Sequence, residues 1–324
     1  MTNVVAVGLG ITELPFATGA GYWRWVDLCE QGGLDSLWQT DRLVSREPIL
    51  ECMTAMAALA GRTRRLKFGV NVVSLAMREP LLLAKQCATI DMLSEGRLLP
   101  GFGIGSPRGP EWAAMHLDST IRGHVTDEAL EILRLLWTQD RVDYDGRHFK
   151  LTNASISPRP VQAELPIWIG GASDAAIRRT ARYGTGWQAG AETPAQLAPI
   201  VASIRAAAIA AGRCIDDDHY GAAFPYHFGR PDDPGVRQAM AAFNKRTGQA
   251  AEEYFAIGNA NTIIDRIAAY IAAGASKFIL RPMARDEDAM MAATRTLIEQ
   301  VLPEVARRWP RPRKTSANHQ KWGG

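Results

Sequence analysis

The stretch that decides the fold runs from Leu66 to Ser106 and reads LKFGVNVVSLAMREPLLLAKQCATIDMLSEGRLLPGFGIGS. It opens with an apolar run, Phe68–Val73, which is typical of a strand covered on both sheet faces. Apolar residues then recur with helical spacing over Leu82–Leu93, and Gly96 is placed to end that helix. A second apolar strand follows and ends in the glycine-rich segment Gly101–Ser106. We therefore expect a parallel strand–helix–strand unit whose ligand lies beyond the carboxyl ends of its strands.

The same alternation of strand and helix recurs along the whole chain. The expected strands are Val4–Gly8, Ser36–Gln39, Leu66–Val73, Leu98–Gly103, Ile167–Gly170, Gly186–Ala189, Gly221–Phe228 and Lys277–Leu280. The expected helices are Gly21–Gln31, Pro48–Ala60, Pro80–Ser94, Thr120–Thr138, Asp174–Tyr183, Pro194–Ala211, Ala260–Ala273 and Glu287–Arg308. Eight such units are the number in a TIM (β/α)8 barrel, whereas open sheets more often stop at five or six strands. We predict an α/β fold with a single barrel domain over residues 1–308.

Two stretches interrupt this alternation, and we expect both to be insertions. Residues 141–166 contain Asp145-Gly146 between short alternating runs, which is a β-hairpin signal. Residues 229–258 are rich in proline, aspartate and charge. A long loop on the strand-to-helix side of a barrel often covers the site, so we interpret this second stretch as a lid.

The composition is ordinary for a globular chain, since 47% of the 324 residues are hydrophobic and 22% are charged. The net charge of +3 arises in residues 307–324, which carry six Lys or Arg and no Asp or Glu, so the rest of the chain has a formal charge of −3. A nucleic-acid-binding protein needs its basic residues on a folded face. We therefore expect residues 309–324 to be a disordered basic tail and the protein not to bind nucleic acid.

The cysteines and the apolar runs indicate a cytoplasmic protein. The four cysteines form no C-x-x-C pair, and three of them fall within helical apolar patterns, as buried thiols of a reducing compartment do. No apolar run approaches the roughly 18 residues of a membrane span. The start of the chain lacks the basic and apolar segments of a signal peptide. We predict that no membrane is involved.

The active site of a barrel lies at the carboxyl ends of its strands. The residues expected there are Asp41, Arg42, Asn71, Gly103, Gly105, Ser106, Gly170, Gly171, Ala172, Ser173, Gln188, His227 and Arg281. The histidines show no zinc-binding spacing, and there is no G-x-S-x-G motif, so neither a metal site nor a serine nucleophile is predicted. A barrel mouth of glycines and amides suggests that a bound cofactor supplies the chemistry.

The glycine-rich strand ends have two interpretations each. Gly101–Ser106 lacks the G-x-G-x-x-G spacing, and its glycines fit either a flat cofactor ring or the close approach of a neighbouring backbone. Gly170–Asp174 follows a buried strand and opens a helix, so its free N–H groups make either a phosphate site or an ordinary capped turn. Of the next two arginines, Arg178 and Arg179, at most one could reach back to an anion there.

The charged candidates are similarly open. Asp41 could pair with Arg42 on the surface, or it could bind a cofactor ring or act as an acid or base. Glu111 lies beyond the glycine-rich strand end on a loop that could reach the same place. His227 is a lone histidine with a packing role as an alternative, and Arg281 is available for an anionic group.

Several long motifs, in order, carry a family resemblance. They are Arg78-Glu-Pro80, Ala84-Lys85-Gln86, Ala88-Thr89-Ile90-Asp91, Leu93-Ser94, Gly96-Arg97, Gly101-Phe-Gly103-Ile-Gly105, Arg122-Gly123, Asp127-Glu128-Ala-Leu130, Leu136-Trp137, Leu165-Pro-Ile-Trp-Ile-Gly-Gly171 and Gly186-Trp187. Through them the chain resembles the bacterial luciferase-like family of flavin-dependent oxidoreductases over roughly residues 4–305. Many relatives carry His where this chain has Arg42, so the acid–base residue at this corner stays open.

The resemblance implies a cofactor and its site. The cofactor would be FMN or the deazaflavin coenzyme F-420 (F420), with its phosphate near Gly170, Gly171, Ala172 and Ser173. Asn71 and Val72 would lie beside the ring, and deazaflavin-using relatives have a cis peptide bond at the position of Asn71-Val72. Gly103, Gly105 and Ser106 would complete the cofactor site. Our hypothesis from the residues themselves is that Asp41 and Glu111 orient the ring or the substrate as the catalytic residues, with His227 and Arg281 at the substrate.

The resemblance leaves three functions open. The chain would be an enzyme that transfers hydride with F420, or a monooxygenase that receives reduced FMN from a separate reductase, in either case acting on a small-molecule substrate. As in some relatives, it could instead bind a flavin without turnover. The helices at 48–60 and 80–94 would present the face of a homodimer. Two segments, 36–42 and 277–282, resemble the F420-using members of the family more than the FMN-using ones.

Overall fold

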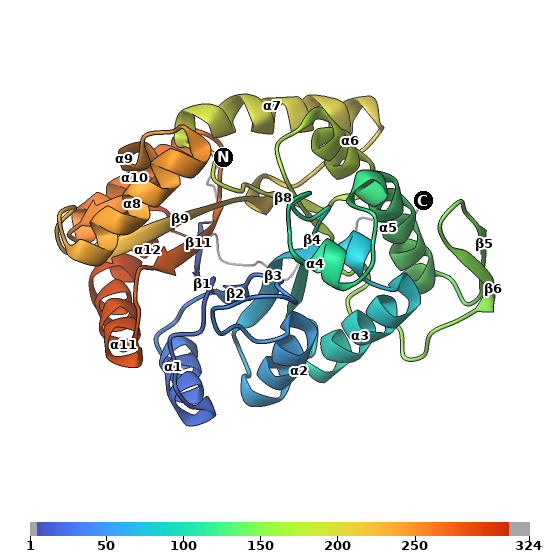
Figure 1. The fold of residues 1–324 in the computed structure, drawn as a ribbon, viewed down its shortest axis with the longest axis horizontal. Helices are drawn as coiled ribbons and strands as arrows, with labels where there is room; N and C mark the ends of the chain where they lie inside the picture. Colours follow the sequence, from blue (N-terminus) through green and yellow to red (C-terminus); the bar gives the residue numbers. More distant parts are fainter. Residues whose placement is uncertain (1–4, 311–324) are drawn as a thin grey trace.

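The computed structural model describes residues 5–310, and eight parallel strands form a closed barrel at its centre (Figure 1). The barrel strands are β1 (Ala6–Ile11), β2 (Ser36–Gln39), β3 (Lys67–Ser74), β4 (Leu98–Gly103), β7 (Trp168–Gly170), β8 (Gly186–Gln188), β9 (Tyr220–Phe228) and β11 (Lys277–Pro282). They pair in this order, β11 pairs with β1, and the contact between β8 and β9 closes the barrel. The predicted TIM-type barrel is confirmed.

An outer ring of helices covers the barrel (Figure 1). Its members are α1 (Gly19–Gln31), α2 (Cys52–Arg62), α3 (Pro80–Leu93), α5 (Arg122–Thr138), α6 (Asp174–Tyr183), α7 (Pro194–Ala210), α10 (Ala260–Ala272), α11 (Glu287–Thr296) and α12 (Leu302–Arg308), with the short α4 (Glu111–Ala114) before α5. The last predicted helix is divided by a π-helical turn over Leu297–Val301, and Pro303 lies in the first turn of the helix that follows. Proline has no N–H for the regular hydrogen bond, which explains the irregular turn there.

The first insertion is a hairpin, as predicted. Strands β5 (Val142–Asp145) and β6 (Lys150–Ala154) are antiparallel and stand beside α5 (Figure 1). The carboxylate of Glu128 on α5 accepts hydrogen bonds from the backbone N–H groups of Arg147, His148 and Phe149 at 2.9–3.1 Å. These three hydrogen bonds to the half-buried Glu128 fix the turn to the body of the protein.

The second insertion was expected to be a long loop, and that prediction is wrong. It contains α8 (Pro234–Thr247), α9 (Ala251–Tyr254) and β10 (Ala256–Gly258), which adds in parallel to the end of β9. Pro234 in the first turn and Gly248 at φ +71° are helix start and stop signals. Val236, Met240 and Phe243 are buried with helical spacing. The polar composition of the segment made this helical spacing hard to recognise. The segment packs beside β9 through β10 and these buried residues.

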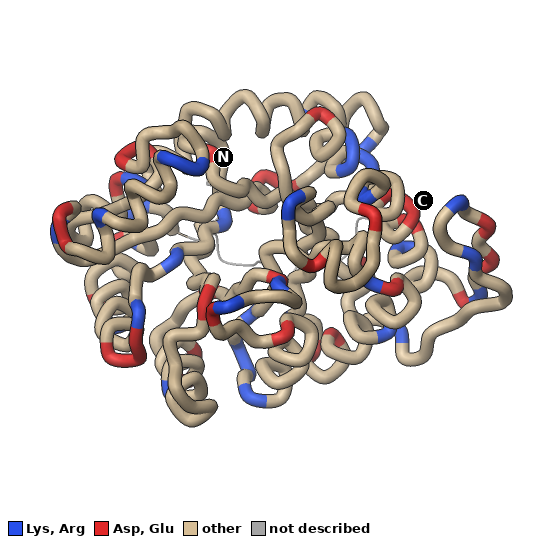
Figure 2. The backbone as a smooth tube through the Cα atoms, in the orientation of Figure 1, with Lys and Arg blue, Asp and Glu red and all other residues tan. Residues whose placement is uncertain are grey.

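The interior of the barrel is apolar in its middle and ionic at its amino-terminal end. Trp38, Ala223 and Ile279 form a separate buried cluster inside the ring of strands. Beneath it, the ammonium of Lys277 pairs with the carboxylate of Asp35, and both side chains are 5% exposed. On the outside, charges of both signs are interspersed over the helices (Figure 2). No helix within residues 5–310 is long and apolar enough to cross a bilayer.

Candidate functional site

A cleft of about 470 Å³ opens at the carboxyl ends of β2, β3 and β4. Its walls are the loop after β2, the end of β3 and the loop after β4. The lining residues are Asp41, Arg42, Leu43, Val44, Ser45, Arg46, Glu47, Ser74, Met77, Ser106, Gly109, Pro110 and Glu111. The fold thus brings together four residues expected at the mouth, Asp41, Arg42, Ser106 and Glu111, from two separate loops. This volume suits a small organic molecule.

Asp41 is held in place by three donors. Its Oδ1 accepts hydrogen bonds from the Arg78 guanidinium at 2.6 Å and from the Cys52 thiol at 3.4 Å, and its Oδ2 accepts one from the Ser74 N–H at 3.1 Å. The Asp41 side chain is only 3% exposed. The alternative that Asp41 pairs with Arg42 is wrong, because its partner is Arg78. Asp41 therefore presents a fixed carboxylate at the edge of the cleft.

Glu111 is the second carboxylate of the cleft and is held differently. It is the first residue of α4 and is 9% exposed. Within residues 5–310, no donor or cation contacts its carboxylate at hydrogen-bond or ion-pair distance. Its neighbour Trp112 donates from Nε1 to the carbonyl of Ser106 at 2.7 Å, which orders the loop between them. Glu111 is thus a buried carboxylate that lines the cleft without a partner among the described residues.

Beside the cleft, Val72 occupies the barrel mouth. The Asn71–Val72 peptide bond is cis, as the resemblance implied, and the register between β3 and β4 shifts at this point. A Cβ placed on Gly103 would lie 2.6 Å from Val72 Cγ2, and one on Gly170 would lie 2.9 Å from Val72 Cγ1. A Cβ on Gly101 would lie 2.4 Å from the carbonyl oxygen of Val70. Gly101 and Gly103 therefore leave room for the neighbouring strand β3, one of the two alternatives predicted for this segment, and Gly170 leaves room for the same Val72 side chain.

Several buried polar atoms near the mouth have no partner. Among the described residues, Thr40 Oγ1, Asn71 Nδ2 and both amide atoms of Gln188 are buried without a hydrogen bond. Leaving such atoms unpaired costs roughly 1–3 kcal/mol each, so a native site normally supplies a partner. A flavin-type ring carries both donors and acceptors on its edge. The unpaired polar atoms at this mouth therefore fit the edge of such a ring.

The segment after β7 is a capped helix start. Ser173 is the N-cap of α6, and its side chain accepts a hydrogen bond from the Ala176 N–H at 3.3 Å. Gly171 has φ +108°, and its carbonyl accepts from Trp187 Nε1 at 2.8 Å. Arg179 does not reach back, because it pairs with Asp127 on α5 at 2.6 Å. The capped-turn interpretation is confirmed, and the phosphate role of this segment stays a prediction.

His227 and Arg281 lie in another sector of the mouth, on β9 and β11, and do not line the cleft. They follow Ala223 and Ile279 by four and two residues, so strand alternation points both inward. His227 Nε2 is 2.9 Å from Asp233 Oδ2, and hydrogen bonds from the Arg230 N–H and from His227 lower the pKa of Asp233. Arg281 is half-buried and has no ion-pair or hydrogen-bond partner among residues 5–310. Arg281 is thus a cation open to a ligand, whereas His227 is satisfied.

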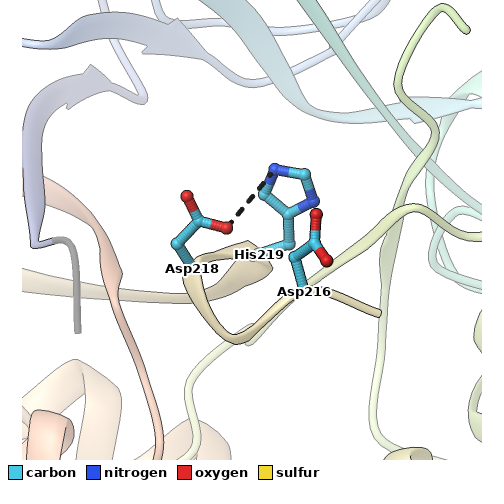
Figure 3. A group of neighbouring side chains, drawn as sticks. All are labelled: Asp216, Asp218 and His219. Atoms are coloured by element: carbon cyan, nitrogen blue, oxygen red, sulfur yellow. Dashed lines mark ion pairs between the residues drawn. The ribbon is translucent and has the colours of Figure 1, made fainter. Parts of the chain in front are cut away.

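One cluster has the side chains of a metal site but lies elsewhere. The ligand atoms of Asp216, Asp218 and His219 lie within 4.8 Å of one another, and His219 Nε2 is 3.8 Å from Asp218 Oδ1 (Figure 3). The cluster immediately precedes β9, at the amino-terminal end of the barrel. It is therefore separate from the mouth, and both of its aspartates are exposed.

Sequence reasoning missed the role of Arg78 and of the β3 end. Arg78 belonged to a quoted motif but received no site assignment, and Ser74 was overlooked. Ser74 ends the strand that carries Asn71 and Arg78 follows it by four residues, and this position was the available signal. Their contact with Asp41 depends on how β2 and β3 lie side by side, which no local pattern shows.

Comparison with known proteins agrees with this geometry. Residues 18–296 match the family model of luciferase-like monooxygenases. The chain is 35% identical over 160 residues to the uncharacterized protein Rv0940c of Mycobacterium tuberculosis (strain ATCC 25618 / H37Rv), covering 49% of this chain and 54% of that one. It is 31% identical over 193 residues to the pyrimidine monooxygenase RutA of Stutzerimonas stutzeri (strain A1501), covering 56% and 50%. It is 30% identical over 171 residues to the F420-dependent glucose-6-phosphate dehydrogenase of Amycolatopsis mediterranei (strain U-32), covering 49% of each.

The matched stretch spans about half the length of these relatives. Two solved structures share the fold over 93% of this chain, each with a TM-score of 0.78. One is the monooxygenase RslO1 of Streptomyces bottropensis, at 21% identity and 100% coverage of that chain. The other is an F420-dependent secondary alcohol dehydrogenase in complex with an F420–acetone adduct, at 19% identity and 99% coverage. At these identities the structures establish the fold.

Proposed function

The chain belongs to the luciferase-like monooxygenase family, and from this premise we propose that it is an oxidoreductase that transfers hydride with coenzyme F420. The observation that carries the proposal is the carboxylate of Glu111, which is 9% exposed, has no partner in the described chain and faces the cleft beside Asp41. Oxidising or reducing a C–O or C–N bond by hydride also moves one proton. A buried, unpaired acid next to the mouth suits that task.

Several residues of the chain would bind the cofactor. Bound F420 would supply the hydride donor or acceptor. Asn71 and Thr40 would bind the ring edge, Val72 would support the ring face, and the N–H groups at Gly171–Ser173 would bind the phosphate. Gly103, Gly105 and Ser106 would border the same site.

The substrate would lie between the ring and two groups of protein residues. Glu111 would hold the proton that leaves or joins the substrate oxygen or nitrogen, and Asp41 would orient the reacting group from its fixed position. Arg281 would bind an anionic group, since it is half-buried without a described partner, and His227 would border this contact. Closure of the cleft by ring and substrate would exclude water.

A second candidate is a monooxygenase that uses reduced FMN from a separate reductase. Similarity to the pyrimidine monooxygenase RutA favours it to the same degree as similarity to the F420-dependent dehydrogenase favours the first. The unpaired polar atoms at the mouth suit either ring, so cofactor binding must distinguish the two. The exposed apolar residues of α3, including Leu82 and Leu93, suit a homodimer face in either case.

The deciding experiment is a titration of apo-protein with F420, with FMN and with reduced FMN, followed by cofactor fluorescence or absorbance. We expect F420 to bind at least tenfold more tightly than either form of FMN. Tighter binding of reduced FMN would establish the monooxygenase instead. Binding of none would overturn the cofactor assignment. In the F420-loaded protein, Glu111→Gln should leave the affinity for F420 within twofold while abolishing most turnover, because the amide cannot carry the proton.

A further inference from the structure

Arg78 lies behind the cleft and bridges two carboxylates. It sits between the turn Leu75–Met77 and α3, and its side chain is 13% exposed. One terminal nitrogen donates to Asp41 Oδ1 at 2.6 Å and the other to Glu51 Oε1 at 2.8 Å. Arg78 itself is not among the residues that line the cleft. It therefore acts on whatever the cleft holds only through other residues.

The two carboxylates that Arg78 joins bind different elements of the fold. Glu51 is the N-cap of α2, and its other oxygen accepts from the Thr54 N–H at 2.7 Å. Asp41 instead accepts from the N–H of Ser74, the last residue of β3, at 3.1 Å. A chain of contacts thus runs from Arg78 through Asp41 to the end of the strand that carries Asn71 and Val72. Glu51 branches away from that chain into α2.

The surroundings of this corner make the guanidinium hard to replace. The Cys52 thiol lies between the charges, 3.4 Å from Asp41 Oδ1 and 3.3 Å from the guanidinium. Burial raises the pKa of this thiol, so it stays neutral and adds no charge. Without Arg78, the buried carboxylate of Asp41 and the partly exposed carboxylate of Glu51 would lose the cation that lies between them. Asp41, at 3% exposure, would then be a buried charge without its ion-pair partner, which favours its displacement toward water.

From these contacts we propose that Arg78 is a positioning residue for the cofactor. Arg78 fixes Asp41 and, through Asp41, the Asn71–Ser74 end of β3. The inference rests on the proposed function for the identity of the ligand. The contact chain itself exists in the protein without cofactor. Loss of Arg78 therefore loosens the β3 end in the free protein and weakens cofactor binding as a consequence.

The test combines amide hydrogen exchange of the apo-protein with F420 titration. Arg78→Met should speed exchange in residues 71–77 at least tenfold and weaken F420 binding about tenfold, and Arg78→Lys should restore most of the affinity. Asp41→Asn should reproduce both effects, and adding Arg78→Met to it should change the affinity less than twofold. Glu51→Gln should leave both readouts within twofold of the wild type.

The matched control is Arg97→Met. It removes another half-buried arginine, whose guanidinium donates to the carbonyls of Leu66 and Thr63 at the other end of β3. It should lower stability without changing exchange in residues 71–77 or the affinity for F420. If Arg78→Met leaves exchange at 71–77 unchanged, the positioning role is overturned, whatever the cofactor proves to be. If the wild type binds no F420 or FMN, the proposed function fails, while the exchange comparison still decides the role of Arg78.

Discussion

The two ends of the barrel use a largely buried arginine in opposite ways. At the amino-terminal end, Arg97 donates to five neutral acceptors, the carbonyls of Ala60, Thr63, Leu66 and Ser94 and the hydroxyl of Thr63. At the carboxyl end, Arg78 donates to two ionised carboxylates and a thiol, and its Nε is buried without a partner. The first arginine satisfies all five of its N–H donors, and the second does not.

This difference separates stability from function. Contacts with neutral backbone carbonyls tie strands and helices together whatever the protein binds. Ionised carboxylates and unpaired amides at the mouth cost free energy of folding unless a ligand completes them. Natural proteins retain such destabilising groups at the places where binding requires them. The comparison therefore predicts that changes at the amino-terminal end lower stability alone, whereas changes at the mouth alter binding.

The largest expected effect is at the amino-terminal end. Lys277→Met removes the buried ammonium that pairs with the carboxylate of Asp35, so the free energy of unfolding should fall by about 3–5 kcal/mol. Cofactor affinity of the folded protein should stay within twofold. Urea unfolding and F420 titration measure the two quantities. As a control, Arg62→Met breaks the exposed pair with Asp27 and should leave the free energy of unfolding almost unchanged. Equal losses in the two variants would contradict the comparison.

At the mouth, Asn71→Leu should have the reverse effect. It removes a buried Nδ2 that has no partner among the described residues, so stability should stay the same or rise. Cofactor affinity should fall by about 1–3 kcal/mol, since the ring loses its hydrogen bond. The same two measurements apply. A variant that is destabilised but binds normally would show that Asn71 serves the fold.

Ser173→Ala tests the helix start that we assign to the phosphate. The affinity for F420 should fall by about 0.5–1.5 kcal/mol, the net value of one hydrogen bond. Stability should also fall slightly, because Ser173 caps α6. Thr18→Ala removes the equivalent cap of α1, whose side chain accepts from the Gly21 N–H at 3.1 Å, and serves as the control for that loss. An unchanged affinity in Ser173→Ala, relative to Thr18→Ala, would remove the phosphate assignment.

The smallest effect concerns acid stability. Burial opposes ionisation of Glu51, but hydrogen bonds from Thr54 and Arg78 outweigh it and lower the pKa of Glu51 to about 2. The unfolded state therefore binds this proton first, so the stabilisation is present above the ordinary pKa of 4.5 and is lost as the pH falls toward 2. Because the side chain is 38% exposed, we expect less than about 1 kcal/mol. Glu51→Gln should flatten this part of the stability–pH curve, and an unchanged curve would place the acid transition elsewhere.

Most of the fold was predictable because each strand and helix carries its own signal. The apolar strand runs set every barrel strand to within a few residues, as Ser36–Gln39 and Leu98–Gly103 show. The exception was the segment 229–258, where Val236, Met240 and Phe243 had helical spacing among polar residues. The polar composition of this segment favoured a loop, although the spacing of these three apolar residues favoured a helix. The predicted basic tail at 309–324 lies largely outside the described residues.

The candidate site was only partly predictable. Asp41 and Glu111 were expected at the mouth because they follow barrel strands, and they do line one cleft. The partner of Asp41 was not predictable from its neighbour Arg42, because Arg78 reaches it from 37 residues away. In the same way, the space that Gly103 and Gly170 leave is filled by Val72 of another strand. Such contacts depend on strand order and register.

The sequence by itself determined the barrel, its helices, the hairpin and the family to which the chain belongs. Each of these follows from periodicity, turn residues or motif order, which are local along the chain. Only the tertiary structure decided that Asp41 is fixed by Arg78 while Glu111 and Arg281 stay without described partners. The physical reason is that a side chain's partners are set by distances between segments remote in sequence. A residue's type fixes the chemistry it can offer, and the packing of strands fixes whether that chemistry is already satisfied or left for a ligand.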